Sequence, residues 1–176
     1  MEHTEKRCIL WVGDKHSGKT TAATKLTMSL QQQDYAVGGI LAPSIYKDGQ
    51  LIGFDIVDIQ NNFRIPLAVR DEQAYDTVPY RYYQKGLKLG HSALSLVGNK
   101  SANLVIVDEY GPLELSGKGW HFDVNRLLTK SYSPILLVVR RELADEVRKL
   151  YARYICFSLE SLDSKSIDRM LVWLKE

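Results

Sequence analysis

The run GDKHSGKTT at residues 13–21 constrains the fold of this chain more than any other part of its sequence. It fits the pattern G-x-x-x-x-G-K-[ST], in which glycines let the backbone approach phosphates closely and successive N–H groups form an anion-binding nest. Lys19 is placed to reach terminal phosphates, and the Thr20 hydroxyl is placed to bind Mg²⁺. The sequence therefore predicts a phosphate-binding P-loop made of Gly13, Asp14, Lys15, His16, Ser17, Gly18, Lys19, Thr20 and Thr21.

The residues on either side of the loop are those that a P-loop needs. Residues 8–12 form a short apolar run that is typical of a buried parallel strand. Residues 20–33 place apolar side chains on one helical face and contain no residue that breaks a helix. A helix that starts at the end of the loop offers the positive end of its dipole to a bound anion.

The middle of the chain has a different pattern. Residues 35–46, 51–60 and 63–69 are strand-like and are joined by short turns. Because such links are too short for a crossover helix, we expect an antiparallel meander attached to the sheet. Residues 71–86 are polar and rich in tyrosine, including Tyr75, and we expect a loop there.

Strands and helices alternate in the rest of the chain. Apolar runs typical of strands occur at residues 104–107, 135–139 and 155–159. Helical patterns of apolar residues lie before, between and after these runs, at residues 87–97, 124–128, 143–150 and 167–174. This alternation predicts an α/β fold with helices on both faces of a mostly parallel sheet.

Composition and charge argue against several other classes of protein. A net charge of +2 over 176 residues is too small to favour a surface for nucleic acid or membrane. No apolar run approaches the ~20 residues that a membrane span needs, and residues 1–7 lead into a strand instead of a signal-peptide core. We therefore expect a cytoplasmic protein without a nucleic-acid or membrane partner, and the sequence leaves a protein partner open.

The cysteines and histidines predict neither a disulfide nor a zinc site. Cys8 and Cys156 lie in apolar runs, so we expect both to be small buried core residues. The four histidines show no metal-ligand spacing with each other or with cysteine. His16 lies inside the P-loop, where most positions contribute only backbone, and we expect its side chain at the rim of the site.

A second motif follows the strand at residues 104–107. Asp108 and Glu109 would stand at its carboxyl end, which is the edge of an α/β sheet where ligands bind. We expect Asp108 to hold Mg²⁺ together with Thr20. A carboxylate beside the metal aspartate can orient and deprotonate water, so we assign Glu109 as the general base. The alternative is a strand that simply ends in two solvated acids.

Four segments occur in a distinctive order along the chain. They are the P-loop, the strand that ends in Asp108-Glu109, GPLEL at residues 111–115 and GKGW at residues 117–120. Together they resemble the THEP-type nucleoside-triphosphatase family, and residues 38–40 and 52–55 also fit its pattern. The resemblance covers nearly the whole chain and implies one P-loop NTPase domain over residues 1–176. It also implies a three-layer α/β sandwich whose RecA-like, mostly parallel sheet carries the added meander.

Two features depart from the family pattern. Tyr110 stands where the family usually has a small aliphatic residue, and the P-loop contains Lys15 and His16. Neither departure removes a ligand for phosphate or metal. We expect them to affect nucleotide preference and rate.

Two arginines follow the strand at residues 135–139. A guanidinium at this edge of the sheet can neutralise charge that develops on a transferred phosphoryl group. We favour Arg140 over Arg141 for this role. The alternative is that one or both simply begin a solvated helix with Glu142 and Asp145.

These features favour Mg²⁺-dependent hydrolysis of a nucleoside triphosphate, ATP or GTP, to the diphosphate and phosphate. We assign Lys19, Glu109 and Arg140 as the catalytic residues. A small nucleoside or nucleotide kinase is an alternative, although no arginine-rich lid is apparent in the sequence. A nucleotide-operated switch with slow intrinsic hydrolysis is a third possibility, and phosphate release by the isolated protein separates it from the first.

Overall fold

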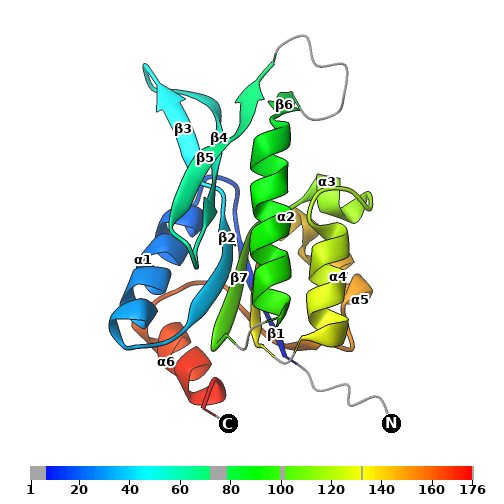
Figure 1. Cartoon of the computed structure of the whole chain (residues 1–176). Helices are drawn as coiled ribbons and strands as arrows, with labels where there is room; N and C mark the ends of the chain where they lie inside the picture. Colours follow the sequence, from blue (N-terminus) through cyan, green and yellow to red (C-terminus); the bar gives the residue numbers. More distant parts are fainter. Residues whose placement is uncertain (1–6, 72–78, 100–101, 132, 176) are drawn as a thin grey trace.

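The structure, a computed structural model, describes residues 7–71, 79–99, 102–131 and 133–175 (Figure 1). Its described strands form one nine-stranded sheet in the order β6-β5-β4-β2-β7-β8-β1-β9, and β3 pairs with β4. The strands are β1 (Cys8–Gly13), β2 (Val37–Leu41), β3 (Ser44–Lys47), β4 (Gln50–Asp58), β5 (Phe63–Arg70), β6 (Tyr80–Tyr82), β7 (Leu104–Tyr110), β8 (Ile135–Arg140) and β9 (Ile155–Leu159). The helices are α1 (Lys19–Gln32), α2 (Gln84–Asn99), α3 (Pro112–Leu115), α4 (His121–Lys130), the 3₁₀ helix η1 (Arg141–Leu143), α5 (Ala144–Leu150) and α6 (Ser164–Trp173).

The parallel part of the sheet consists of β2, β7, β8, β1 and β9, with helices on both faces (Figure 1). On one face, α1 and α6 pack against side chains of β1 and β7 such as Ile9 and Ile106. On the other face, α2, α4 and α5 pack against the alternate side chains of the same strands, such as Leu10 and Val107. Because both faces are covered, β1, β7 and β8 are apolar up to their carboxyl ends, which is why their runs were visible in the sequence.

The antiparallel part extends from β2, where β4 pairs with β2, β3 and β5, and β5 pairs with β6. One prediction about this part was wrong, because residues 35–46 form two strands instead of one. The strand is interrupted at Ala42 and Pro43. The Ala42 N–H donates to the Asp108 side chain, and Pro43 has no N–H to donate. As a result β2 pairs in parallel with β7 along most of its length and antiparallel with β4 only at Ile40 and Leu41, whereas β3 forms an antiparallel hairpin with β4.

The predicted loop at residues 71–86 was also wrong in its second half. Tyr80–Tyr82 form β6, which pairs with Ala68, Val69 and Arg70 of β5, and α2 begins at Gln84. Tyr75 lies outside the described residues. A strand of this kind depends on a partner strand and on packing of its tyrosines against the core, and neither shows in a polar local sequence.

A glycine in β2 allows the close approach of β2 to β7. Gly39 has φ +105°, and a Cβ there would lie 2.0 Å from the backbone oxygen of Ile106, so β2 can approach β7 only with glycine at this position.

The two cysteines differ in burial. Cys8 is fully buried as expected, whereas Cys156 is only half-buried because β9 is an edge strand. Among the described helices, none is both long and apolar enough to cross a membrane.

Candidate active site

The P-loop connects the end of β1 to the start of α1. His16 and Gly18 have φ values of 60° and 79°, which turn the backbone around a hollow at the N-terminus of the helix. Lys19 is buried, and its Nζ donates a hydrogen bond of 2.5 Å to the carbonyl oxygen of Asp14. A Cβ at Gly13 would lie 3.0 Å from the Lys19 side chain, so a glycine there leaves room for the lysine. The lysine charge therefore lies inside the loop, where an anion would bind.

Asp108 is fully buried at the end of β7. Its Oδ2 accepts a hydrogen bond of 3.1 Å from the Ala42 N–H, and its Oδ1 has no hydrogen-bond partner among the described residues. Burial and the neighbouring Glu109 carboxylate raise the pKa of Asp108 to about 6, although the Thr20 hydroxyl lies close enough to lower it in part. An unpaired carboxylate oxygen beside a hydroxyl fits a hard divalent cation that takes oxygen ligands.

A metal ion at Asp108 and Thr20 would need further ligands from outside the protein. Among the described residues, no three His, Cys, Asp or Glu side chains come together as a metal site. Asp108 and Thr20 supply two oxygen donors, and Mg²⁺ typically completes its shell with waters and substrate phosphates. The donor set therefore suits Mg²⁺ bound together with a nucleotide and does not suit zinc.

Glu109 points in a different direction from Asp108 because the strand is irregular at this point. The pairing of β7 with β8 shifts between Val107 and Tyr110, and Glu109 has φ +58°. A non-glycine residue in this conformation costs about 1–2 kcal/mol, and such strain is concentrated at functional sites. The irregularity directs the Glu109 side chain into a cavity, while Asp108 remains buried.

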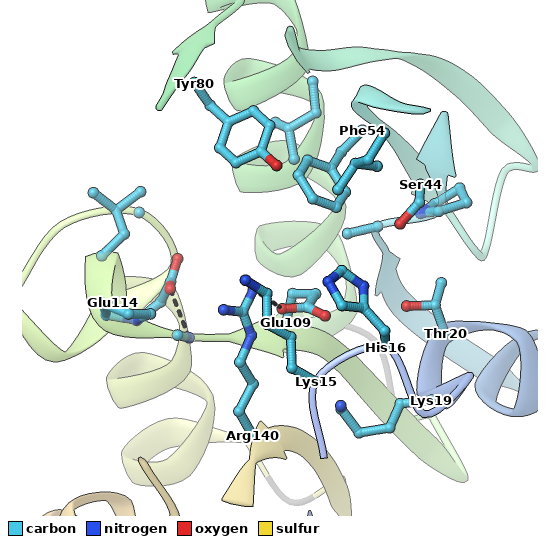
Figure 2. Close-up of a pocket in the computed structure, with 18 of the residues that line it drawn as sticks. Lys15, His16, Lys19, Thr20, Ser44, Phe54, Tyr80, Glu109, Glu114 and Arg140 are labelled. Atoms are coloured by element: carbon cyan, nitrogen blue, oxygen red, sulfur yellow. Dashed lines mark hydrogen bonds and ion pairs between the residues drawn. The ribbon is translucent and has the colours of Figure 1, made fainter. Parts of the chain in front are cut away.

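Arg140 and Arg141 have different surroundings, although they are adjacent. Arg140 ends β8 opposite Gly13 of β1, and its Nη2 lies 3.2 Å from Oε2 of Glu109. Both side chains of this ion pair are about a quarter exposed and line the cavity (Figure 2). Arg141 is exposed and makes ion pairs of 2.7 Å with Asp14 and with Glu160. The geometry therefore favours Arg140 as the arginine that can meet a bound phosphate.

A cavity of about 510 Å³ is lined by Lys19, Thr20, Glu109 and Arg140, whereas Asp108 and Arg141 are not among its lining residues (Figure 2). Its polar end is formed by the P-loop, Glu109 and Arg140, and the exposed His16 lies there at the rim, as expected. Its other end is apolar, and we call it the aromatic chamber. The chamber residues are Phe54, Leu67, Tyr80, Tyr82, Leu87 and Trp120.

Sequence reasoning missed Glu114 as a site residue. It is buried, and its carboxylate accepts hydrogen bonds from the N–H groups of Gly111, at 2.9 Å, and Trp120, at 3.3 Å. It forms no ion pair with any described residue, and burial raises its pKa to about 7. The available signal was Gly-Pro followed by a glutamate at the third position of a helix, which is half of a capping box and begins α3.

The chamber residues were missed for a different reason. They come from β4, β5, β6, α2 and the segment before α4, and no spacing in the sequence connects them. Tyr110, in contrast, lies outside the cavity lining. It is fully buried, and its hydroxyl is 2.7 Å from that of Tyr151 and 3.3 Å from Nδ1 of His121. This departure from the family pattern therefore fills the core behind the site instead of changing the cavity.

Comparisons with known proteins agree with this site. A family model described as NTPase matches residues 8–168. A nucleoside-triphosphatase THEP1 of Methanopyrus kandleri is 28% identical over 179 residues, which cover 96% of this chain and 97% of that protein. A nucleoside-triphosphatase THEP1 of Archaeoglobus fulgidus is 31% identical over 140 residues, which cover 78% of this chain and 82% of that protein.

Two solved structures share the fold. The crystal structure of THEP1 from the hyperthermophile Aquifex aeolicus aligns with a TM-score of 0.72 at 16% identity, over 96% of this chain and 99% of that chain. The solution structure of a human cancer-related nucleoside triphosphatase aligns with a TM-score of 0.66 at 19% identity, over 96% and 95% of the two chains. The predicted α/β sandwich, mostly parallel with an antiparallel segment, is thus confirmed.

Proposed function

This chain belongs to the NTPase family of THEP1-type nucleoside-triphosphatases, and we propose that its P-loop cavity hydrolyses ATP or GTP to the diphosphate and phosphate with Mg²⁺. One observation carries the proposal. The P-loop and the end of β7 meet at the polar end of one cavity, so that Lys19, Thr20, Glu109 and Arg140 all line it. These are the side chains that binding, metal coordination, water activation and charge neutralisation require.

Binding of the phosphates relies on the P-loop and the helix that follows it. A P-loop binds phosphate through its backbone N–H groups and the N-terminus of the helix that follows, and α1 begins at Lys19, directly after the loop. Because Lys19 is buried, its charge is poorly screened by solvent and acts strongly on a phosphate that enters the loop.

Thr20 and Asp108 would hold the Mg²⁺. Bound there, the ion would neutralise negative charge on the terminal phosphates. The fit rests on the unpaired Oδ1 of Asp108, which a cation would satisfy.

Glu109 and Arg140 act on the reaction itself. Glu109 accepts a proton from the water that attacks the terminal phosphorus, and the in-line displacement releases the diphosphate. Arg140 is the cation beside Glu109, and its guanidinium can turn from the carboxylate to the phosphoryl oxygens as negative charge develops there. The ion pair thus keeps both groups at the attack side of the site.

The proposal is tested by phosphate release from ATP, GTP, CTP and UTP, with Mg²⁺ and with EDTA. We expect release with Mg²⁺ for the wild type and none above background for Lys19→Ala, because that change removes the charge on the terminal phosphates. Lys25→Ala is the matched control, since Lys25 is an exposed lysine on α1. Near wild-type release by Lys19→Ala would refute the proposal, and nucleotide binding by the wild type without release would indicate a switch protein instead.

The metal assignment has a test of its own. Thr20→Ala and Asp108→Asn should each raise the Mg²⁺ concentration that gives half-maximal phosphate release, because each removes a ligand. Thr20→Ser keeps the hydroxyl and should behave like the wild type. If the Mg²⁺ dependence is the same in all four proteins, the ion binds elsewhere.

A further inference from the structure

Hydrolysis leaves the aromatic chamber without a role. Water and the terminal phosphate need only the polar end of the cavity, around Glu109 and Arg140. The whole cavity, at about 510 Å³, falls in the range of roughly 300–1,000 Å³ that is typical of sites for organic ligands. The cavity therefore has the size of a site for an organic ligand, and the chamber extends it beyond the P-loop.

The chamber lies on the attack side of the terminal phosphate. In an in-line displacement the attacking group and the leaving diphosphate stand on opposite sides of the phosphorus. Under the proposed function Glu109 marks the attack side, and Figure 2 shows Phe54 and Tyr80 beyond Glu109, away from Lys19. The nucleoside of the triphosphate is attached to the diphosphate and therefore lies on the leaving side of the phosphorus. The chamber, on the attack side, faces a different molecule.

The chemistry of the chamber selects a flat, partly polar ring. Phe54 and Tyr80 form an edge-to-face pair with ring centroids 5.1 Å apart, and Tyr82 and Trp120 add further aromatic surface. Aromatic side chains of this kind stack on any nucleobase, because every base has a π-face. The Glu114 carboxylate also lines the cavity, where its Oε2 accepts from the Gly111 N–H and its Oε1 from the Trp120 N–H. A carboxylate oxygen has a second lone pair, which can accept a ring or amino N–H of a bound base.

We propose that the aromatic chamber binds a nucleoside, whose hydroxyl replaces water as the acceptor of the terminal phosphoryl group. The inference rests on the proposed function, because the same P-loop, Glu109 and Arg140 carry out the transfer. A bond forms between the acceptor oxygen and the terminal phosphorus, and the bond to the oxygen that bridges to the diphosphate breaks. The hydroxyl proton passes to Glu109, and the products are the nucleoside diphosphate and a phosphorylated nucleoside.

The experiment supplies ATP labelled at its terminal phosphate together with Mg²⁺ and one of five acceptors: adenosine, guanosine, cytidine, uridine or thymidine. Label is measured in inorganic phosphate and in nucleoside monophosphate. We expect at least one nucleoside to take up label while the release of inorganic phosphate falls. If no nucleoside is labelled and none alters phosphate release, the inference is overturned, whereas the proposed function is judged separately by release without any acceptor.

A pair of variants locates the acceptor site. Phe54→Leu keeps an apolar side chain but removes the ring, and we expect label transfer to fall at least about tenfold through the lost stacking. Phe63→Leu is the matched control, because Phe63 is an exposed phenylalanine outside the cavity lining. Equal label transfer by Phe54→Leu and Phe63→Leu would overturn the placement of the acceptor in the aromatic chamber. A weaker affinity of Phe54→Leu for a non-hydrolysable ATP analogue, with transfer unchanged, would assign the chamber to the base of the triphosphate and would also overturn it.

Glu114→Gln tests the carboxylate that lines the cavity together with the aromatic chamber. Glutamine keeps one oxygen, for the N–H of Gly111 or of Trp120, and has an NH₂ donor in place of the other oxygen, so the preference among the five nucleosides should change. Thermal unfolding checks that the variant is folded. An unchanged order of preference would show that Glu114 does not contact the acceptor base.

Discussion

Two adjacent carboxylates at the end of β7 have opposite environments, and this difference supports the separate roles that we propose for them. Asp108 is fully buried against Ala42, whereas Glu109 has a left-handed backbone and lies partly exposed beside Arg140. A buried carboxylate with an unpaired oxygen suits a metal ion, and a partly exposed one at the attack side suits proton transfer. The irregular pairing of β7 makes it possible for neighbouring residues to do both.

Arg140 and Arg141 allow a matched pair of predictions, because they are adjacent in the chain but have different surroundings. Arg140→Ala should lower turnover roughly 100-fold, because it removes a group that meets charge mainly in the transition state. Affinity for a non-hydrolysable triphosphate should change little, and Arg140→Lys should rescue poorly because lysine lacks the planar fork. Arg141→Ala should have a much smaller effect on turnover, since Arg141 makes only exposed ion pairs. Steady-state phosphate release decides the matter, and equal turnover in both alanine variants would contradict the assignment.

Most residues at the polar end of the cavity could be predicted from the sequence. The P-loop is contiguous, and Asp108 and Glu109 end an apolar strand, so local spacing was enough to identify them. Glu114, Phe54 and Tyr80 could not be identified in this way, because the fold alone brings them to one cavity. The pairing of Glu109 with Arg140 instead of Arg141 likewise depends on the twist and register of β8.

At the scale of elements, the close contact of β2 with β7 positions the acidic end of β7. Gly39→Ala should destabilise the protein by about 3 kcal/mol or more, since the new Cβ clashes with the backbone of Ile106 and φ is +105°. Gly49→Ala is the matched control. Gly49 also has a positive φ, +76°, but nothing lies within 4 Å of its Cβ position, so about 1 kcal/mol of strain is expected. Urea unfolding measures both, and an equal loss would contradict the role of the close contact.

The elements that the sequence failed to predict are those stabilised by distant partners. β6 and the start of α2 lie in a polar, tyrosine-rich segment, and β6 forms because β5 supplies a strand to pair with. The break between β2 and β3 depends on the Ala42 N–H, which bonds to a side chain 66 residues away. In contrast, β1, β7 and β8 are apolar up to their carboxyl ends, and their positions followed directly from the sequence.

At the scale of the whole molecule, burying Glu114 makes stability depend on pH. Burial raises the pKa of this carboxyl from 4.5 to about 7, so the folded state holds a proton that the unfolded state releases. The free energy of unfolding should therefore fall as pH rises from about 4.5 to 7, by roughly 3 kcal/mol from this group.

Comparison with an isosteric variant isolates that contribution. Urea unfolding between pH 4.5 and 8 should show a smaller loss of stability in Glu114→Gln than in the wild type, because glutamine does not titrate. Other buried acids, including Asp108, contribute equally to both proteins. If the two proteins lose the same stability over this range, Glu114 does not hold its proton when folded.

The central claim is that this P-loop site hydrolyses triphosphates with Glu109 as the base. The most direct test is phosphate release by Glu109→Gln, measured together with its affinity for a non-hydrolysable triphosphate in the presence of Mg²⁺. The account predicts that release falls about 100- to 10,000-fold, because glutamine cannot accept the proton, while affinity is retained. Turnover that stays at the wild-type level in Glu109→Gln would contradict it.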